Sequence, residues 1–365
     1  MANDPAYKYA PDEVYAPGET LRGLLQAREI KQTELASYLG TSEKALSQLI
    51  NGKVGLSQEM ALKLQRVLGV QASFWNNLEA RYQEYLTFKR EEDRLRKQEA
   101  FLKCFPLNEM RKRGWIPKRK REEIVESLRD LLGFFGVASV EAWHGVWETA
   151  EVAFLQSQKV TTSHYAVAAW LRRCELVSRR QVPAYDEEAF KEVLREVRQL
   201  ACQMPVEWKR NLEDRCASAG VNVVLVEQLP KTGVQGATRW MNGRPLLMLT
   251  LRYKRADSFW FAFFHEAAHI LLHSRNQVFL ELDEPDTLAE VELEANEWAR
   301  DFLIPKWSWN QFVSASGGRF TESRIVEFSH SAGVHSGTVV GRLQHEGLLK
   351  YDEQNSLKIH LSWDK

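Results

Sequence analysis

The chain has 365 residues, which is more than one ordinary domain holds, so we expect two or three domains. Its 49 Lys and Arg residues equal its 49 Asp and Glu residues, so a polycation is excluded and nucleic-acid binding would need a local basic surface. Four dispersed cysteines without a C-x-x-C pair exclude a disulfide framework and a thiolate zinc site. The polar N-terminus and the lack of apolar runs near ~18 residues predict a cytoplasmic protein with no membrane partner.

Residues 17–86 have the pattern of a compact group of short helices. Apolar residues recur at helical spacing, N-capping residues stand before the runs, and glycines follow them. The first helix is predicted to begin near Pro17, and the others to cover residues 32–39, 42–51, 56–68 and 73–89.

Residues 90–217 are also predicted to be helical, in segments such as 121–135, 140–155, 165–176 and 187–200. Their tryptophans (Trp143, Trp147, Trp170) are expected in the core, since large aromatic side chains dominate core burial. Residues 89–121 hold 13 Lys or Arg and 5 Asp or Glu. This basic run offers a nucleic-acid surface, although such runs are more often solvated helical faces.

The pattern changes after Gly220. The β-branched run 221–226 predicts a strand, and Asn242-Gly243 between two apolar runs predicts a hairpin. We then expect a helix from a Ser258 cap to about residue 273, a helix over 288–303, two short helices in 321–349, and a final strand at 356–361.

These elements predict a mainly α protein with a small β-sheet, of the α+β class. We expect three domains: a bundle of short helices at residues 1–90, a helical linking region at 91–217, and a domain with the predicted sheet and C-terminal helices at 218–365.

The predicted helix after Ser258 contains H-E-x-x-H at His265, Glu266 and His269. Positions i and i+4 share one helix face, so both imidazoles point to one place. Zinc ions favour this arrangement because Zn–N bonds are short and the geometry is tetrahedral. The motif also arises by chance, as two surface histidines with a solvated glutamate. Apolar flanks at 259–261 and 270–272 favour a buried site, where histidines need polar partners.

A third ligand is expected on the following helix, because catalytic zinc takes three protein ligands and keeps one place open. Glu290, Glu292 and Glu294 are the candidates. Glu292 is preferred because only it has Asn296 four residues later, where the amide can hydrogen-bond the outer nitrogen of a ligand histidine.

The chemistry that this site implies is hydrolysis, with Zn2+ as the cofactor and Glu266 as general base. A donor for the oxyanion is also needed, and Arg252, Tyr253 and His273 remain candidates. His273 is another four residues along the helix, where we expect it to end the helix and line the cleft rather than bind the metal.

Residues 29–53 have the spacing of a helix-turn-helix. The N-terminal part of the second helix would face base edges in the major groove, and flanking polar residues would meet phosphates. The predicted base-facing residues are Glu43, Lys44, Ser47 and Gln48, and the predicted phosphate contacts are Gln32, Thr41, Asn51 and Lys53. The predicted small core is Ala36, Leu39, Ala45, Leu46 and Leu49. The alternative is a helical bundle that contacts only proteins.

Residues 17–86 resemble the HigA-type antitoxin branch of the XRE/Cro-like helix-turn-helix family. The matching segments are 17–19, 32–36, 50–53 and 74–82. The rest of the chain resembles the ImmA/IrrE-type metallo-endopeptidase family, in segments 236–240, 251–254, 259–273, 292–305 and 339–345. Ala268 departs from that family, which often has glycine there, but alanine is a good helix former.

The two resemblances imply a helix-turn-helix domain at residues 1–90 and a zincin-like metallopeptidase domain at 218–365. The peptidase resemblance also implies zinc ligation by His265, His269 and the first glutamate of an E-x-E-A-[ND] motif, which is Glu292 here. Known members of that family cleave helix-turn-helix repressors. The antitoxin resemblance implies binding to operator DNA, usually as a homodimer, and a toxin partner.

Taken together, the residues and the resemblance predict a DNA-binding transcription regulator with its own zinc endopeptidase, which cleaves a repressor, a partner toxin or itself. A non-catalytic antitoxin or repressor with a structural or sensory zinc domain is the first alternative. The second is a peptidase whose N-terminal domain docks other repressors rather than DNA.

Overall fold

The computed structural model describes residues 14–148, 163–178, 181–273, 279–282 and 290–363. It divides into two compact units, Met1–Glu99 and Ala100–Lys365. Helices dominate the described residues and one four-stranded sheet accompanies them, which confirms the predicted α+β class. Within the described residues, no helix has the length and apolar content needed to cross a bilayer.

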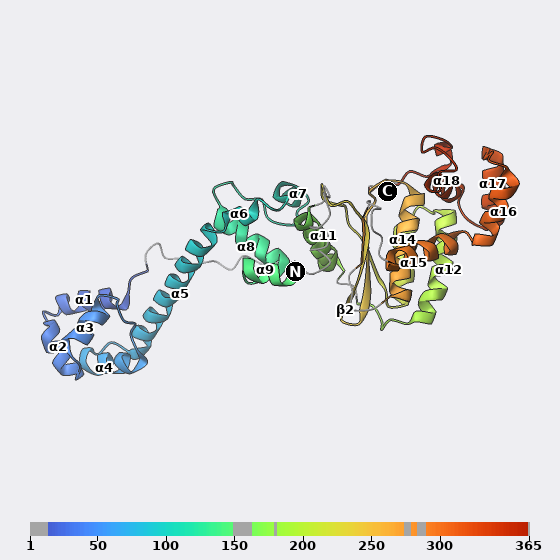
Figure 1. Ribbon diagram of the computed structural model, residues 1–365. Helices are drawn as coiled ribbons and strands as arrows, with labels where there is room; N and C mark the ends of the chain where they lie inside the picture. Colours follow the sequence, from blue (N-terminus) through green and yellow to red (C-terminus); the bar gives the residue numbers. More distant parts are fainter. Residues whose placement is uncertain (1–13, 149–162, 179–180, 274–278, 283–289, 364–365) are drawn as a thin grey trace. The chain divides into compact units, whose positions relative to one another are not determined.

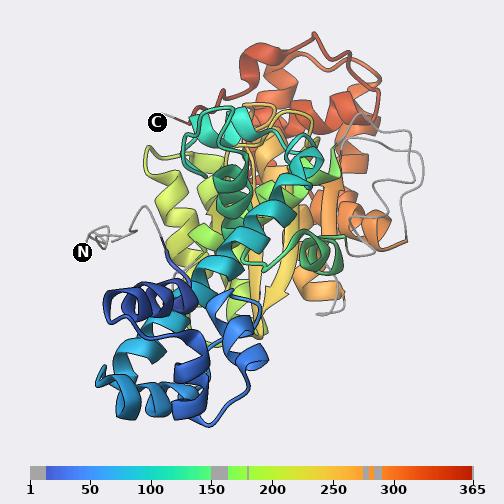
Figure 2. The same cartoon turned by 90° about the vertical axis from the view of Figure 1, so that its left-hand side faces the viewer.

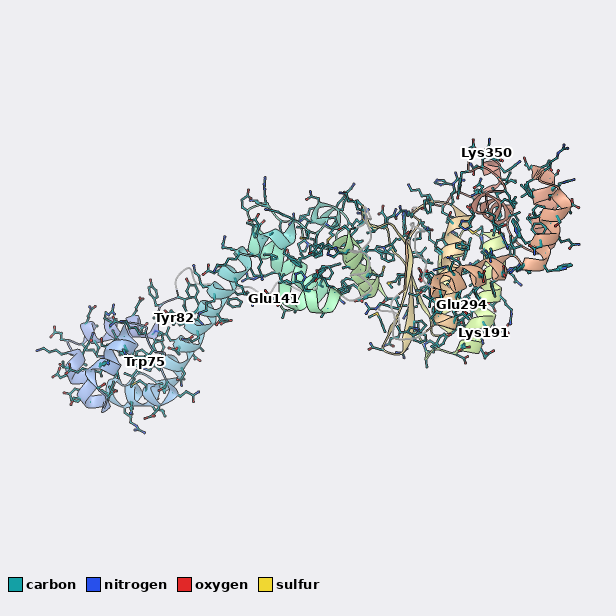
Figure 3. The ribbon with its side chains drawn as sticks, viewed as in Figure 1. Trp75, Tyr82, Glu141, Lys191, Glu294 and Lys350 are labelled. Carbon is teal, nitrogen blue, oxygen red and sulfur yellow. The ribbon has the colours of Figure 1, made fainter. Side chains whose placement is uncertain are left out.

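The first unit is a group of helices with its own core, which centres on the fully buried Trp75 (Figure 3). Figure 2 shows its helices, in blue, grouped around the start of the longest one. The helices are α1 Pro17–Ala27, α2 Gln32–Leu39, α3 Glu43–Ile50, α4 Gln58–Leu68 and α5 Ala72–Arg96.

The predicted helix ends of this unit are largely confirmed. Gly40 ends α2 in the left-handed conformation (φ 61°), and the Ser42 hydroxyl caps α3 by accepting from the Ala45 amide. Two expectations were wrong. The last helix does not end near residue 89 but continues to Arg96, and Ala45 is exposed because it lies on the outer face of α3.

The second unit holds the sheet and the remaining helices. The helices are α6 Glu99–Leu102, at the boundary, α7 Leu107–Lys112, α8 Ile124–Phe135, α9 Val140–Trp147, α11 His164–Val177, α12 Glu187–Gln203, α13 Trp208–Ser218, α14 Ala256–Leu272, α15 Glu290–Leu303, α16 Lys306–Ser316, α17 Glu322–Ala332 and α18 Ser336–His345. Residues 91–217, predicted as a linking region, are split at residue 99 and mostly share a unit with the sheet. The three-domain division itself stays a prediction.

The sheet has the order β1-β3-β2-β4. Its strands are β1 Asn222–Leu225, β2 Val234–Met241, β3 Arg244–Leu249 and β4 Phe279–Leu282. β3 pairs in parallel with β1 and antiparallel with β2, and β4 pairs antiparallel with the other side of β2. The β2–β3 hairpin turns at Asn242 (φ 52°) and Gly243 (φ 74°), as the Asn-Gly signal predicts.

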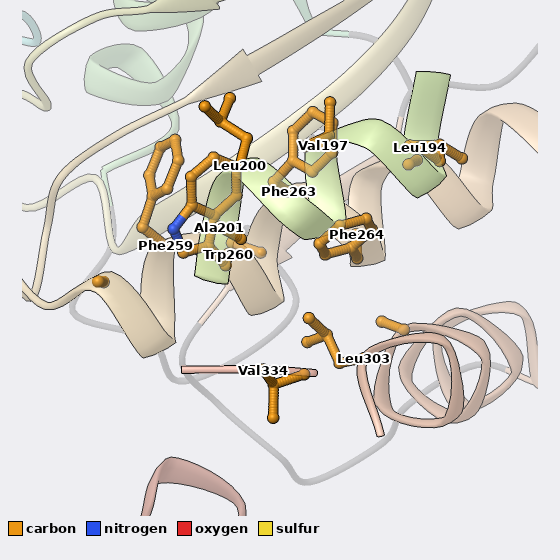
Figure 4. Close-up of a cluster of buried hydrophobic side chains, with 14 of the residues drawn as sticks. Leu194, Val197, Leu200, Ala201, Phe259, Trp260, Phe263, Phe264, Leu303 and Val334 are labelled. Atoms are coloured by element: carbon orange, nitrogen blue, oxygen red, sulfur yellow. The ribbon is translucent and has the colours of Figure 1, made fainter. Parts of the chain in front are cut away.

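Helix α14 packs against β2 and β3, and α11 contacts β1 and β3 on the other side of the sheet (Figure 1). The aromatic side chains of α14, such as Trp260 and Phe263, meet the apolar face of α12 (Figure 4). This core fixes α14 between the sheet and α12, and α15 lies beside it. Trp143, Trp147 and Trp170 are buried as expected.

Several elements differ from the sequence-based expectations. Helix α14 begins at Ala256 rather than at a Ser258 cap, because the C-terminal segment satisfies the Ala256 amide through the Ile359 carbonyl. The predicted strand at 356–361 is wrong: Asn355–Leu357 is a 3-10 turn, and only an isolated bridge joins His360 to Arg255. Helix α16 and strand β4 were missed, and residues 149–155 of one predicted helix lie outside the described residues.

Candidate functional site

The candidate site is built on α14, which is apolar on nearly every side and is therefore buried in the second unit. Within this apolar helix, His265, Glu266 and His269 are 1%, 0% and 1% exposed. Burial of three polar side chains on one short stretch is costly unless they have polar or metal partners.

The two histidines meet a carboxylate from α15. His265 Nε2 lies 3.0 Å from His269 Nε2 and 3.1 Å from Glu292 Oε2. His269 Nε2 lies 3.5 Å from Glu292 Oε1. Among the described residues, these three form the one group of His, Cys, Asp or Glu whose ligand atoms converge closely enough to hold a metal ion.

The spacing fits a zinc ion. Tetrahedral ligands at bond lengths of about 2.0–2.1 Å are about 3.3–3.4 Å apart, and the three atom pairs here are 3.0–3.5 Å apart. Two imidazoles and one carboxylate are also a donor set that catalytic zinc sites use. The geometry therefore fits the predicted ligand set, while metal binding stays a prediction.

Of the three glutamates on α15 that the sequence left open, Glu292 is the one that contacts both histidines. Glu290 is exposed, and Glu294 is 62% exposed and contacts His273 instead. Asn296 Oδ1 accepts from His265 Nδ1 at 3.0 Å, which is the contact expected for an amide four residues after the ligand.

The surroundings of His269 and Glu292 shift the pKa values of both side chains. Burial lowers the pKa of His269 to about 4, because a charged imidazole loses its hydration there. Burial alone would raise the pKa of Glu292, but hydrogen bonds from both histidines outweigh it and bring the pKa to about 2. The imidazole is thus neutral and the carboxylate ionised at pH 7.

Glu266 lies under strand β2. Its carboxylate is packed so closely against Gly236 that a Cβ on that glycine would stand 2.7 Å from Glu266 Oε1 and 2.8 Å from its Cγ. The Thr238 hydroxyl, two residues along β2, donates to the Glu266 backbone carbonyl at 3.2 Å. Sequence reasoning did not identify Gly236 as part of the site. A glycine in the strand interior was the available signal, since it often marks a close approach.

Two of the three candidate oxyanion donors, Arg252 and Tyr253, lie together just before α14, and the third, His273, stands at the C-terminal end of that helix. The Arg252 guanidinium stands 5.6 Å from the centre of the Tyr253 ring, and Tyr253 is 47% exposed. Their role stays a prediction.

In the first unit, α2 and α3 are joined by the turn at Gly40 and are positioned by buried apolar residues. Ala36, Leu39, Leu46 and Leu49 belong to the core of this unit, as predicted. The core therefore fixes the face of α3 that remains on the outside.

The predicted nucleic-acid contacts lie on that outer face and beside it. Glu43 and Lys44 are exposed in the first turn of α3, and Ser47 and Gln48 are partly exposed one turn later. The predicted phosphate contacts Gln32, Asn51 and Lys53 are exposed and Thr41 is partly exposed.

The Asn51 side chain also makes hydrogen bonds within the first unit. Its amide donates to the Ser47 carbonyl at 2.8 Å, and its Oδ1 accepts from the Arg22 guanidinium at 2.9 Å. These bonds close the end of α3 against α1.

The basic run 89–121 is partly used inside the second unit. Arg113 pairs with Glu109 and Glu227, and Arg119 pairs with Asp130. These arginines stabilise local structure, which favours the interpretation of the run as a structural and solvated segment.

Comparison with known families assigns both parts of the chain. Residues 21–75 match the helix-turn-helix family, and residues 216–315 match the IrrE N-terminal-like domain. The second range contains His265, His269 and Glu292. The chain thus combines an N-terminal helix-turn-helix domain of the XRE-like kind with an IrrE-like domain.

Individual relatives match about a fifth of the chain. Virulence-associated protein A' of Dichelobacter nodosus is 39% identical over 67 residues, which is 18% of this chain and 58% of that relative's length. Solved neighbours include antitoxin HigA of Pseudomonas aeruginosa with the higBA promoter (28% identity, TM-score 0.22, 22% of this chain and 90% of that one). A HigA-family antidote protein of Coxiella burnetii matches with 24% identity and a TM-score of 0.22, over 23% of this chain and 94% of that one.

Proposed function

We propose that this protein is a DNA-binding transcription regulator that also carries a zinc-dependent endopeptidase. The peptidase cleaves a repressor, a partner toxin or the protein itself. The observation that carries the proposal is the convergence of His265, His269 and Glu292 beside the buried Glu266. The match to an IrrE N-terminal-like domain over the same residues supports it.

The proposed chemistry divides between the ligands and the base. His265, His269 and Glu292 would hold the zinc ion, which when bound supplies the Lewis acidity that makes water acidic near neutral pH and polarises a peptide carbonyl. Glu266 takes the proton from the attacking water and passes it to the leaving amine. Its close packing against Gly236 limits the movement of the side chain, which supports a preorganised base.

The N-terminal domain supplies the DNA-binding part of the proposal. Its α3 exposes Lys44 and leaves Gln48 accessible, and both side chains can reach base edges from the major groove. HigA of Pseudomonas aeruginosa was solved with its promoter, which is consistent with an operator as the target here. A homodimer on a two-fold operator is part of this proposal.

Cleavage is tested with the Glu266→Gln variant. The purified protein is incubated with the products of neighbouring genes, with and without a chelator, and fragments are identified by mass spectrometry. We expect Glu266→Gln to retain zinc and to lose about 10²–10⁴-fold in cleavage rate. Glu290→Gln, an exposed change on α15, is the control and should cleave normally. Equal cleavage by Glu266→Gln and the unmodified protein would remove Glu266 as the base.

DNA binding is tested with Gln48→Ala and Lys44→Ala on the region upstream of the gene. We expect each change to weaken operator binding by ~1–3 kcal/mol, with little effect on unrelated DNA. Arg66→Ala removes an exposed cation from α4 and serves as the control. Unchanged operator selectivity and no salt dependence would favour a domain that docks proteins instead.

A non-catalytic regulator is the competing function. In that case zinc would stabilise the second unit, and neither fragments nor a Glu266 dependence would appear. The buried Glu266 argues against it, since a purely structural zinc site is usually closed by four protein ligands and needs no buried base beside it.

A further inference from the structure

The outer nitrogens of the two ligand histidines have different partners. His265 Nδ1 contacts the Asn296 amide oxygen directly. His269 Nδ1 instead lies 2.8 Å from Nδ1 of His273, and His273 Nε2 lies 3.2 Å from Glu294 Oε2. His269 Nδ1 is thus the start of a line of two successive hydrogen bonds, first to His273 and then to the Glu294 carboxylate.

The protons in this line can be placed in one consistent way. If Nε2 of His269 faces the metal, its Nδ1 carries the proton and donates to Nδ1 of His273. That nitrogen must then be an acceptor, so the His273 proton is on Nε2. The Nε2–H group in turn donates to the Glu294 carboxylate, which is acceptor-only when ionised.

The position of His273 in this line of hydrogen bonds is set by its burial and by the end of α14. The His273 side chain is only 5% exposed, whereas Glu294 is 62% exposed. His273 stands at the C-terminal end of α14, and its amide bonds back to the His269 carbonyl at 3.3 Å. Glu294, which is labelled in Figure 3, comes from α15, two residues after Glu292. The two helices that supply the ligands therefore also supply His273 and Glu294.

We propose that His273 and Glu294 are positioning residues for the metal site. Through two successive hydrogen bonds they fix the tautomer and the ring orientation of His269, as Asn296 does in one step for His265. The proposal rests on the proposed zinc site, and it assigns a role to two residues that neither bind the metal nor contact the reacting atoms. Groups of this kind orient ligands and raise their basicity.

The first test measures zinc affinity by competition with a chromophoric chelator at neutral pH. His273→Phe keeps a ring of similar size but removes the acceptor, and we expect affinity to fall about 10–100-fold. Glu294→Gln should give a smaller loss. Glu297→Gln, which changes a 68% exposed carboxylate on the same helix, is the matched control and should bind as the unmodified protein does. Thermal unfolding of the metal-free variants shows whether the fold is kept.

The double variant separates positioning from general damage. Because Glu294 acts through His273, Glu294→Gln should have no further effect when His273 is already Phe, so the two losses should not add. Additive losses, or a His273→Phe variant with unchanged affinity, would overturn the proposal. If the unmodified protein itself takes up no zinc, the proposed function fails first.

Long-range ¹H–¹⁵N spectra of the zinc-loaded protein give a readout that does not depend on folding stability. They distinguish the two neutral tautomers of each imidazole. We expect the Nε2–H tautomer for His273 and the Nδ1–H tautomer for His269. An Nδ1–H tautomer at His273 cannot accept from His269, and this result would contradict the proposed line of hydrogen bonds.

Discussion

At the scale of single residues, the tightest constraint on the site is the contact between Gly236 and Glu266. Glu266 is fully buried, and its side chain occupies the space that a Cβ on residue 236 would need. The identity of a strand residue therefore determines where the proposed base points.

We expect Gly236→Ala to displace the Glu266 carboxylate, because the added Cβ would stand 2.8 Å from a mid-chain carbon of that side chain. Overpacking of this kind costs about 1–3 kcal/mol of stability. Cleavage should fall by at least about 100-fold, while zinc affinity changes only a few-fold, since the ligands lie elsewhere. Cleavage assays and chelator competition measure the two effects.

Gly145→Ala is the control for that variant. Gly145 lies in α9 with open space around it, so the new methyl group meets nothing. Normal cleavage by Gly236→Ala would show that Glu266 can move without loss and that the close approach has no functional role.

The sequence predicts the ligands better than their surroundings. His265 and His269 follow from a local rule, because i and i+4 share a helix face, and Asn296 follows from Glu292 in the same way. The Gly236 contact joins residues thirty positions apart, on a strand and a helix. The contact of His273 with Glu294 also joins residues that are distant in sequence, at the end of α14 and in α15. Side chains that meet only through tertiary packing leave no local pattern.

At the scale of elements, the start of α14 is held by a buried ion pair from the C-terminal segment. Lys358 Nζ lies 2.5 Å from Asp257 Oδ2 and 2.8 Å from Gln344 Oε1. The Lys358 and Asp257 side chains are only 7% and 6% exposed. Gly341 of α18 packs directly against the same carboxylate.

Lys358→Met should therefore destabilise the second unit by about 3–5 kcal/mol, because it leaves the buried Asp257 carboxylate without its cation. Denaturant unfolding measures the loss. Lys350→Met, at an exposed position (Figure 3), should change stability by no more than about 0.5 kcal/mol. Adding Asp257→Asn to Lys358→Met should restore part of the loss; no recovery would mean that packing, and not charge, carries the effect.

We expect the start of α18 to be sensitive to pH. His335 caps this helix with Nδ1, which accepts from the Gly337 amide at 3.0 Å. Burial lowers the pKa of His335, although the nearby Asp257 opposes the shift. Below the ordinary histidine pKa of 6.5, the His335 imidazole binds a proton in the unfolded chain but stays neutral in the folded chain until a lower pH. The contribution to stability is thus complete above pH 6.5 and is lost as the pH falls towards the folded pKa.

We expect His335→Asn to weaken this pH dependence, since an asparagine caps helices well without titrating in this range. Unfolding experiments at several pH values between about 7.5 and 5 should show a shallower decline for the variant than for the unmodified protein. Parallel declines would place the sensitivity in other groups.

Helices and strands were predicted well where local sequence rules determine them. They were predicted poorly where pairing with a distant strand determines them. Capping residues and glycines located most helices, and Asn242-Gly243 located the hairpin. Strand β4 exists through its pairing with β2, and the C-terminal segment near His360 pairs only as one bridge. The spacing of apolar residues within each segment predicts neither the strand β4 nor the single bridge at His360.

At the scale of the whole molecule, the chain contains separate hydrophobic cores. One consists only of residues from the first unit and surrounds Trp75, and another, around Trp260 and Phe263, consists only of residues from the second. Because these cores share no residues, we expect the two units to unfold in separate transitions.

Metal removal should then affect one unfolding transition and not the other. Zinc at about 100 times its Kd adds ~2.7 kcal/mol to the stability of the unit that binds it, which corresponds to a rise of about 5–11 °C in the melting temperature of a unit of this size. Calorimetry with and without a chelator should show this shift only in the transition of the second unit. A shift of both transitions, or of neither, would contradict metal binding confined to that unit.

Because no residue contributes to both of these cores, either half can be exchanged by recombination without repacking the interior of the other. Under the proposed function, an exchange of the N-terminal helices would change the DNA that is recognised. Substitutions next to β2 would change the proposed peptidase and leave DNA recognition as it is. The modular interiors thus make this chain a ready starting point for both gene fusion and laboratory grafting.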